Sequence, residues 1–385
     1  MMFKIQYENF SRHMVPTLTT ELIGYFSIDG NMQYNDNLTQ LKYYISPPDF
    51  NNVNFNLDIN FESTRHKPTE YIKLDDILKW ILSHFHQFVD RPLSAQEERW
   101  LDIDFISSRG TIKKILSSPY SNKYEEWIIC ASKYRGTIYL CAFYTDEKER
   151  QEQDATMETK RITSWGYKFE QYMLADDPSR RPDPLAPLNE CEKFHCMFRA
   201  NFGRYSLLYG AEVDGICSQE RITEQQFLTD IDETFELIEL KTIPRRHMIG
   251  NNRNISSRLV DWWSQNYLVD IKEIICGLKV SPTNSERCDT VTMIKEYRTD
   301  DLPKISKYSV FDVNKCKIFC KMFLDKVKKI VTKDHNECMY KFYWKSSSKR
   351  LVSYSEEAPD NKIYLFLQPW FLEDVEKYLE LRRAE

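Results

Sequence analysis

The sequence predicts an α+β protein with mixed β-sheets flanked by helices. Segments of alternating apolar and polar residues, typical of half-buried strands, are intermixed with segments whose apolar residues recur every three or four positions, typical of amphipathic helices. With 42% hydrophobic residues, a chain of 385 residues can bury a large core. No Gly/Ser-rich linker, low-complexity block or internal repeat interrupts it, so we expect a single domain over residues 1–385.

The first half of the chain is expected to be rich in strands. Residues 1–60 have the character of short strands and turns, and a helix follows over 74–85, where apolar residues form one stripe at helical spacing. Alternating apolar residues predict strands from 104 to 144. Residues 146–173 begin with a dense run of charges and predict one helix. Its internal Gly166 suggests that another backbone approaches there.

The second half alternates between helices and strands. A proline-rich run at 178–187 is expected to be a loop. A helix with inward tryptophans is expected around 259–265, a strand over 271–280 and an amphipathic helix over 313–331. A strand at 363–367 and a short C-terminal helix complete the predicted order.

The composition restricts the classes of function. The net charge of -5, from 53 basic and 58 acidic residues, argues against a broad electrostatic footprint for nucleic acid, although a local basic channel could still lead to an acidic site. The ten cysteines are scattered, and no apolar run is long enough to span a bilayer. We therefore expect a protein of a reducing compartment with no membrane partner.

Two short apolar segments each carry two ionisable side chains at positions i and i+2. One pair is Glu212 with Asp214, and the other is Glu239 with Lys241. Because side chains two apart in a strand point to the same face, the members of each pair would project together. If the two strands are neighbours, three carboxylates and one ammonium group meet in one place.

Such a cluster is costly to bury, since like charges raise one another's pKa. A hard divalent cation offsets that cost, because Mg²⁺ or Mn²⁺ binds carboxylate oxygens and can flank a phosphate under attack. Either pair alone would more commonly be a solvated strand face with a weak ion pair. Together, on strands that look half buried, the pairs make a metal site as good an interpretation as the solvated face.

Arg109 and Glu170 each allow two interpretations. The tetrapeptide Arg-Gly-Thr-Ile occurs at 109–112 and again at 135–138. Arg-Gly at a strand junction is usually a turn with a solvated arginine, and taken alone the pair favours that turn. The alternative is an arginine held over a phosphate, which its planar fork matches better than lysine does. Glu170 is either an exposed charge between buried aromatic rings or a fourth carboxylate directed into the site.

Five motifs occur in one order along the chain. They are Ser-Arg-Gly at 108–110, Gly-Tyr-Lys-Phe-Glu at 166–170, Glu-Val-Asp at 212–214, Glu-Leu-Lys at 239–241 and Trp-Trp-Ser-Gln at 262–265. In these motifs and their order, all within 105–280, the chain resembles the DXO family of decapping exoribonucleases, which includes the fungal partners of the nuclear 5′→3′ exoribonuclease. The chain has Gly215 where that family often has cysteine, beside the ligands rather than among them.

The resemblance implies a fold similar to the PD-(D/E)XK nucleases and a set of roles for the motif residues. A divalent metal, Mg²⁺ or Mn²⁺, would be held by Glu170, Asp214, Glu239 and the carbonyl of Leu240, with Glu212 beside them. The four carboxylates and Lys241 would be catalytic, with Lys241 orienting and activating the attacking water. The residues implied to bind the RNA 5′ end are Ser108, Arg109, Gly110, Cys196, Glu212, Lys241 and Gln265.

The implied activity is metal-dependent hydrolysis at RNA 5′ ends in mRNA cap quality control. It includes pyrophosphate release from 5′-triphosphate RNA, removal of incomplete or NAD caps, and distributive 5′→3′ exonuclease action. A nuclear 5′→3′ exoribonuclease is an implied partner, and the expected location is the nucleus, with the cytoplasm as a second one. The alternative is a weakly catalytic or non-catalytic scaffold that stabilises that exoribonuclease. Since every motif carboxylate is present, we favour an enzyme; a DNA nuclease has no specific support.

Overall fold

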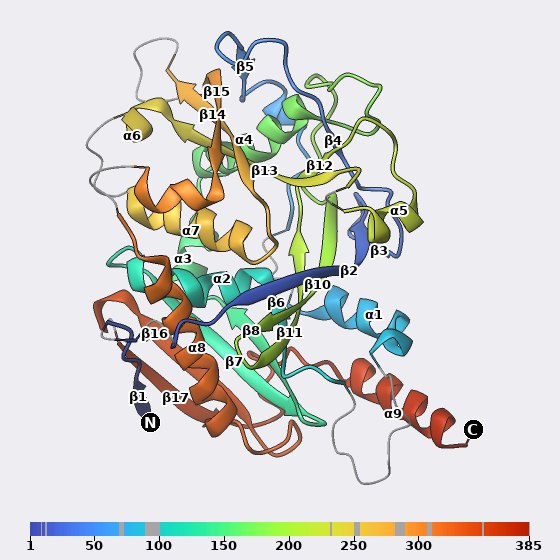
Figure 1. Cartoon of the computed structure of the whole chain (residues 1–385), viewed down its shortest axis with the longest axis vertical. Helices are drawn as coiled ribbons and strands as arrows, with labels where there is room; N and C mark the ends of the chain where they lie inside the picture. The colour runs from blue at the N-terminus through green and yellow to red at the C-terminus, as the bar shows by residue number, and fades with distance from the viewer. Residues whose placement is uncertain are drawn as a thin grey trace.

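The structure is a computed structural model that describes residues 1–8, 10–11, 14–68, 73–88, 101–231, 233–249, 255–281, 289–305, 310–348 and 350–384. These residues form two mixed β-sheets with helices around them, as the sequence predicts (Figure 1). In this part of the chain no helix is both long and apolar enough to cross a membrane. All cysteines in it are free thiols.

The larger sheet has ten strands. Strand β6 runs parallel to its neighbours β8 and β11, and the remaining pairs are antiparallel. In order across the sheet the strands are β1 (Met2–Lys4), β17 (Leu351–Glu357), β16 (Met339–Lys345), β7 (Glu126–Tyr134), β8 (Thr137–Phe143), β6 (Phe105–Ser108), β11 (Tyr205–Glu212), β10 (Lys193–Phe202), β2 (Leu18–Ile28) and β3 (Tyr34–Asn35).

The smaller sheet has seven strands. Its pairs β13–β14 and β12–β4 are parallel, and the others are antiparallel. In order, the strands are β5 (Phe55–Asn56), β15 (Thr290–Arg298), β14 (Glu273–Val280), β13 (Glu236–Pro244), β12 (Gly215–Cys217), β4 (Tyr43–Tyr44) and β9 (Leu174–Ala175).

The α-helices of the described residues vary in length from a single turn to several turns. They are α1 (Asp75–Ser83), α2 (Arg109–Ser117), α3 (Asp146–Gln153), α4 (Met157–Met173), α5 (Glu224–Thr229), α6 (Arg245–Ile249), α7 (Ile255–Tyr267), α8 (Val313–Ile330) and α9 (Pro369–Ala384). Helices α1, α7 and α8 and the C-terminal α9 lie where the sequence predicts helices.

Helices cover both faces of the ten-stranded sheet. Alternate side chains of β7 separate into two cores, with Ile128 and Cys130 on one face and Trp127 and Ile129 on the other. Helices α1 and α9 contact each other over the first face, whereas α2 and α8 contact each other over the second. The stripe that predicts α1 is thus buried in the core.

The seven-stranded sheet lies between α4 and α7. On one face Trp165 and Phe169 of α4 pack with Ile238 and Leu240 of β13, and α7 packs in the other core. An added Cβ at Gly277 of β14 would come within 2.8 Å of the Phe169 ring. Glycine at this position therefore lets α4 approach the sheet closely.

Two helix boundaries differ from the prediction. The strand pattern expected from 104 to 144 is interrupted by α2, because the Ser108 side chain accepts a hydrogen bond from a first-turn N–H and starts a helix. The single helix expected over 146–173 is two helices, α3 and α4. The Thr156 hydroxyl accepts a hydrogen bond from a first-turn N–H of α4 at 3.1 Å, so a new helix begins there.

Three other local expectations are wrong. Strand β2 has 11 residues, longer than the short strands expected in this region. Among the described residues an added Cβ at Gly166 would meet nothing within 4 Å, so the expected approach of another backbone is not found there. The expected strand at 363–367 is absent from the described structure, in which Phe366 and Leu367 fill the core beside α9 without pairing in a sheet.

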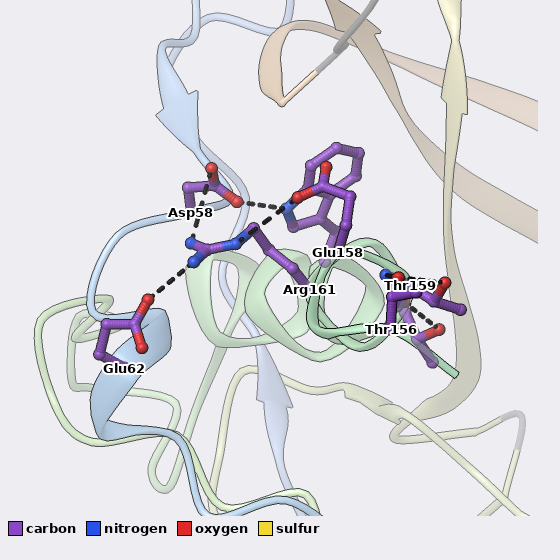
Figure 2. A network of polar contacts seen from close by, with 8 residues as sticks. Asp58, Glu62, Thr156, Glu158, Thr159 and Arg161 are labelled. Carbon is purple, nitrogen blue, oxygen red and sulfur yellow. Dashed lines mark hydrogen bonds and ion pairs between the residues drawn. The ribbon is translucent and has the colours of Figure 1, made fainter. Parts of the chain in front are cut away.

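The N-terminal half of α4 is fixed by a polar network (Figure 2). The Asp58 carboxylate accepts a hydrogen bond from the buried indole N–H of Trp165 at 2.7 Å. The Arg161 guanidinium lies 2.7 Å from Glu62, 3.9 Å from Glu158 and 4.0 Å from Asp58. Asp58 thus joins the segment after β5 to the helix that carries one of the motif carboxylates.

We predict that Asp58→Ala destabilises the protein by roughly 1–3 kcal/mol, because it leaves the buried Trp165 N–H without this acceptor. Glu62→Ala is the matched control, since the Glu62 side chain is 78% exposed and its ion pair should contribute less than about 1 kcal/mol. Urea denaturation of both variants measures the difference. Equal losses in the free energy of unfolding would show that the hydrogen bond to Trp165 stabilises the protein no more than the exposed ion pair of Glu62 does.

Candidate active site

The motif carboxylates lie at the junction of the two sheets. Strand β11 of the larger sheet ends at Glu212, the chain passes through Asp214, and β12 of the smaller sheet then pairs with β13, which carries Glu239. The expectation that Glu212 and Asp214 share one strand beside that of Glu239 is therefore wrong. The chain changes sheets between them, and β12 rather than β11 lies beside β13.

Glu239 is a fully buried residue of the site. Its Oε1 accepts hydrogen bonds from Lys241, two residues along β13, and from the side chain of Gln265 on α7, the latter at 2.5 Å. Its Oε2 lies 3.7 Å from Nη1 of Arg109, and neither of these buried atoms has a hydrogen-bond partner among the described residues. Burial opposes the charge of Lys241, but the carboxylates of Glu239 and Asp214 raise its pKa overall.

Arg109 is positioned by the transition from β6 to α2. Because β6 runs parallel to β11, Ser108 and Glu212 end their strands at the same edge of the larger sheet. Arg109 begins α2 and is only 8% exposed, so the interpretation as a solvated turn arginine is wrong. The positive end of the α2 dipole adds to its charge.

Glu170 and Asp214 are crowded carboxylates. Asp214 Oδ2 accepts a hydrogen bond from the backbone N–H of Leu240 at 2.6 Å. Burial, and then the charges of Asp214 and Glu212, raise the pKa of Glu170 well above its ordinary value. Burial and then the charge of Glu239 raise the pKa of Asp214 to about 7. Both shifts mean that the protein's own cations do not fully offset the negative charge here.

Glu212 has a different environment, and sequence reasoning missed the residue that creates it. Lys193 Nζ lies 3.7 Å from Glu212 Oε2, and β10 places His195 directly opposite Glu212. Loss of water would raise the pKa of Glu212, but Lys193 and then His195 lower it overall. A hairpin of β10 and β11 was the signal that could have predicted Lys193. It turns at Gly203, which has a positive φ, and its register brings the start of β10, with Lys193, beside Glu212 at the end of β11.

Two residues expected to bind substrate lie in contrasting places. Cys196 of β10 is fully buried in the apolar core, and burial raises the pKa of its thiol. Its side chain has no exposed surface, and its expected role in substrate binding stays a prediction. Gly110 is exposed at the second position of α2, where an added Cβ would meet nothing closer than Ser108 Oγ at 3.8 Å.

An open cavity of about 490 Å³ adjoins the carboxylates. Glu170, Glu212 and Asp214 line it together with Lys193. In the described ranges no three His, Cys, Asp or Glu side chains are gathered closely enough to hold a metal ion. Two of the carboxylates instead face groups of the protein itself. Glu239 accepts hydrogen bonds from Lys241 and Gln265, and Glu212 faces Lys193.

Comparison with known proteins identifies the family. Residues 19–372 match the family described as RAI1 like PD-(D/E)XK nuclease. The chain belongs to this family. The resemblance to the decapping exoribonucleases and the expected α+β nuclease fold are thereby confirmed. The family is one of nucleases, so the chain is a hydrolase by descent.

Relatives of this RAI1 like nuclease are known from animals and fungi. The "Decapping and exoribonuclease protein" of Bos taurus is 29% identical over 92% of this chain and 84% of its own length. That of Homo sapiens is 29% identical over 91% of this chain and 84% of its own length.

Solved structures share the fold of this RAI1 like nuclease. Scheffersomyces stipitis Rai1, in complex with (3′-NADP)⁺ and calcium ion, aligns with a TM-score of 0.78 at 16% identity, over 97% of this chain and 100% of the other. Candida albicans Rai1, in complex with pU5-Mn²⁺, aligns with a TM-score of 0.76 at 18% identity, over 98% and 100%. At these identities the alignments establish the fold alone.

We predict that Glu170→Gln and Glu212→Gln change the metal-free stability in opposite directions. In EDTA at neutral pH, Glu170→Gln should raise Tm, because a carboxyl whose pKa is raised on folding destabilises the fold once it is ionised. Glu212→Gln should lower Tm, because a carboxyl whose pKa is lowered on folding, here chiefly by Lys193, stabilises the fold once it is ionised. Thermal denaturation followed by circular dichroism measures both Tm values. A lower Tm for Glu170→Gln would contradict the inference that burial and neighbouring carboxylates destabilise the ionised form of Glu170.

Proposed function

We propose that this chain is a divalent-metal-dependent hydrolase of RNA 5′ ends. The observation that carries the proposal is that the charges of Glu170, Asp214 and Glu239 act on one another where two sheets meet, with Lys241 and Arg109 beside Glu239. The acidic groups fit a hard cation, and the cationic groups fit a phosphate that such a cation would share.

Carboxylate and carbonyl oxygens are the ligand type that Mg²⁺ or Mn²⁺ takes, although the carboxylates of the described residues are not drawn together closely enough to hold an ion without moving. The ligands would be the carboxylates of Glu170, Asp214 and Glu239 and the carbonyl of Leu240, with Glu212 beside them. A bound cation would offset the burial and the repulsion between carboxylates that raise the pKa values of Glu170 and Asp214. It could also pair with Glu239 Oε2, which is buried and has no hydrogen-bond partner among the described residues. When bound, such an ion polarises a phosphoryl oxygen and makes a water molecule easier to deprotonate.

The protein's own groups would position the substrate. Arg109 Nη1 is buried and has no hydrogen-bond partner among the described residues, so its guanidinium can take a phosphate oxygen while the α2 N-terminus adds positive potential. Lys241 would orient the attacking water and offset charge that develops on the phosphate. Gln265 would hold Glu239 in place through its hydrogen bond and contribute to binding the RNA 5′ end.

The choice of RNA 5′ ends rests on the relatives. The curated relatives carry the name decapping and exoribonuclease protein, and one neighbour is described in complex with pU5-Mn²⁺. We propose that this chain releases pyrophosphate from 5′-triphosphate RNA, removes incomplete or NAD caps, and acts in mRNA cap quality control. Every motif carboxylate is present, which favours an enzyme over a scaffold for an exoribonuclease partner.

We predict that the purified chain hydrolyses 5′-triphosphate RNA with Mg²⁺ or Mn²⁺ and that EDTA abolishes the reaction. Product analysis with triphosphate, monophosphate, unmethylated-cap, methylated-cap and NAD-capped RNA identifies the preferred end. Glu212→Ala with Asp214→Ala should reduce hydrolysis to background and abolish the rise in Tm that Mn²⁺ gives the parent.

The matched control for that double variant is Glu373→Ala with Asp374→Ala, which removes two exposed acidic groups from α9. It should retain both hydrolysis and the response of Tm to Mn²⁺. Hydrolysis that persists in EDTA, or in the Glu212 and Asp214 variant, would contradict the metal site.

We predict that Arg109→Lys lowers kcat/KM by roughly 10²-fold, because lysine keeps the charge but loses the planar fork that matches a phosphate. Arg135→Lys is the matched control, since Arg135 begins the second Arg-Gly-Thr-Ile and pairs with Glu376 on α9. That variant should hydrolyse RNA at the parent rate. If the parent, Arg109→Lys and Arg135→Lys are equally active, Arg109 does not bind a phosphate through its planar fork and has only a structural role.

A further inference from the structure

The proline-rich loop 178–187, here called the strap, is held by three side chains in a row. The carbonyl oxygens of Pro184, Leu185 and Ala186 accept hydrogen bonds from three different side chains. The donors are Lys168 Nζ at 3.1 Å, Asn60 Nδ2 at 2.9 Å and Gln171 Nε2 at 3.0 Å respectively. Such anchoring of consecutive carbonyls fixes the path of a segment without regular secondary structure.

Two of these donors flank Glu170 on α4. Lys168 is 2% exposed, and its ammonium also donates to Gln171 Oε1 at 2.6 Å, which orients the Gln171 amide toward the strap. Burial lowers the pKa of Lys168, so the fold holds a cation there at a cost. The helix that supplies a carboxylate to the site therefore also sets the position of the strap.

The strap carries Arg180 and Arg181 into the lining of the cavity that Glu170 and Asp214 share. Both arginines are exposed, and neither side chain forms a hydrogen bond or ion pair within the part of the chain that the structure describes. They are thus cations at the cavity without an ion-pair partner among the described residues.

The acidic residues of the strap region are engaged in shaping its turns. Asp177 Oδ1 accepts hydrogen bonds from the N–H and hydroxyl of Ser179 at 2.9 and 2.6 Å. Asp183 Oδ1 accepts one from the Leu185 N–H at 3.0 Å. The hydrogen bonds from Ser179 lower the pKa of Asp177, and Arg180 lowers it further electrostatically. No carboxylate of the described residues forms an ion pair with either guanidinium, so both can bind an anion from outside the protein.

We propose that the strap is a second phosphate-binding element, in which Arg180 and Arg181 bind backbone phosphates of RNA whose 5′ end occupies the carboxylate site. Lys168 is its positioning residue. The proposal rests on the proposed function for the identity of the ligand, because two unpaired arginines beside an acidic cavity fit a polyanion whose reacting phosphate lies with the carboxylates. It explains how a protein of net charge -5 can retain RNA through a local basic element.

The test is the salt dependence of RNA binding. Fluorescence anisotropy with a 5′-monophosphorylated RNA oligonucleotide, in Ca²⁺ and at several salt concentrations, gives the slope of log affinity against log salt. Each phosphate neutralised on single-stranded nucleic acid contributes about 0.7 to that slope, so Arg180→Ala with Arg181→Ala should flatten it by about 1.4 and weaken binding at least about tenfold. Lys326→Ala with Lys329→Ala on α8 removes the same charge and should leave the slope unchanged.

A dinucleotide carrying a 5′-monophosphate separates backbone phosphates from the 5′ end itself. If the strap binds the RNA backbone, the arginine variant should lose affinity for the oligonucleotide and keep most of its affinity for the dinucleotide. An equal loss for both ligands would overturn the assignment to the RNA backbone and place the arginines at the 5′ end.

The positioning role of Lys168 is tested with both arginines in place. Lys168→Met should flatten the salt slope in the same direction, and combining it with the arginine variant should add little further loss. A merely structural lysine would lower Tm and leave the slope as it was. If Lys168→Met does not fold, Gln171→Ala removes the hydrogen bond to Ala186 and takes its place.

The outcomes separate this proposal from the proposed function. An unchanged slope in the arginine variant, or an equal change in the α8 control, overturns the strap even if the parent hydrolyses RNA. A flattened slope in a protein that hydrolyses no RNA 5′ end supports the strap and overturns the hydrolase.

Discussion

The buried carboxylate of Glu239 is the constraint on which the rest of the site depends. A fully buried carboxylate is destabilising unless it is paired and hydrogen-bonded, and three elements supply its partners. Lys241 comes from the same strand, Gln265 from α7, and Arg109 from the start of α2. The packing of α2 against α7 is therefore also the arrangement that brings an arginine and a glutamine to the same acid.

Helix α4 connects that acid to the outer part of the site. Its apolar face packs on the smaller sheet through Phe169, so the following Glu170 reaches the carboxylates. Its N-terminal half is tied to Asp58, and Lys168 ties it to the strap. One helix thus fixes a carboxylate and the loop beside the cavity together, and a shift of α4 would move both.

Local patterns in the sequence predicted those features of the site that depend only on residues close together in the chain. The i, i+2 spacing of Glu239 and Lys241 correctly placed both on one face of a strand, because β13 is regular there. The same reasoning failed for Glu212 and Asp214, since a change of sheet between two strands leaves no mark in periodicity. Lys193 was missed because its partner is set by the register of a hairpin.

The two copies of Arg-Gly-Thr-Ile show why context decides function. At 135–136 the arginine and glycine both have positive φ and make the two-residue turn between β7 and β8. At 109–110 the preceding Ser108 caps a helix, and the same residues enter α2 with the arginine buried. Identical tetrapeptides thus give one arginine that pairs with Glu376 on the C-terminal helix and one that faces Glu239. The difference lies in the residue before the motif. The Ser108 hydroxyl can accept a hydrogen bond from a free N–H in the first turn of a helix, and the Tyr134 side chain that precedes the other copy cannot cap a helix in this way.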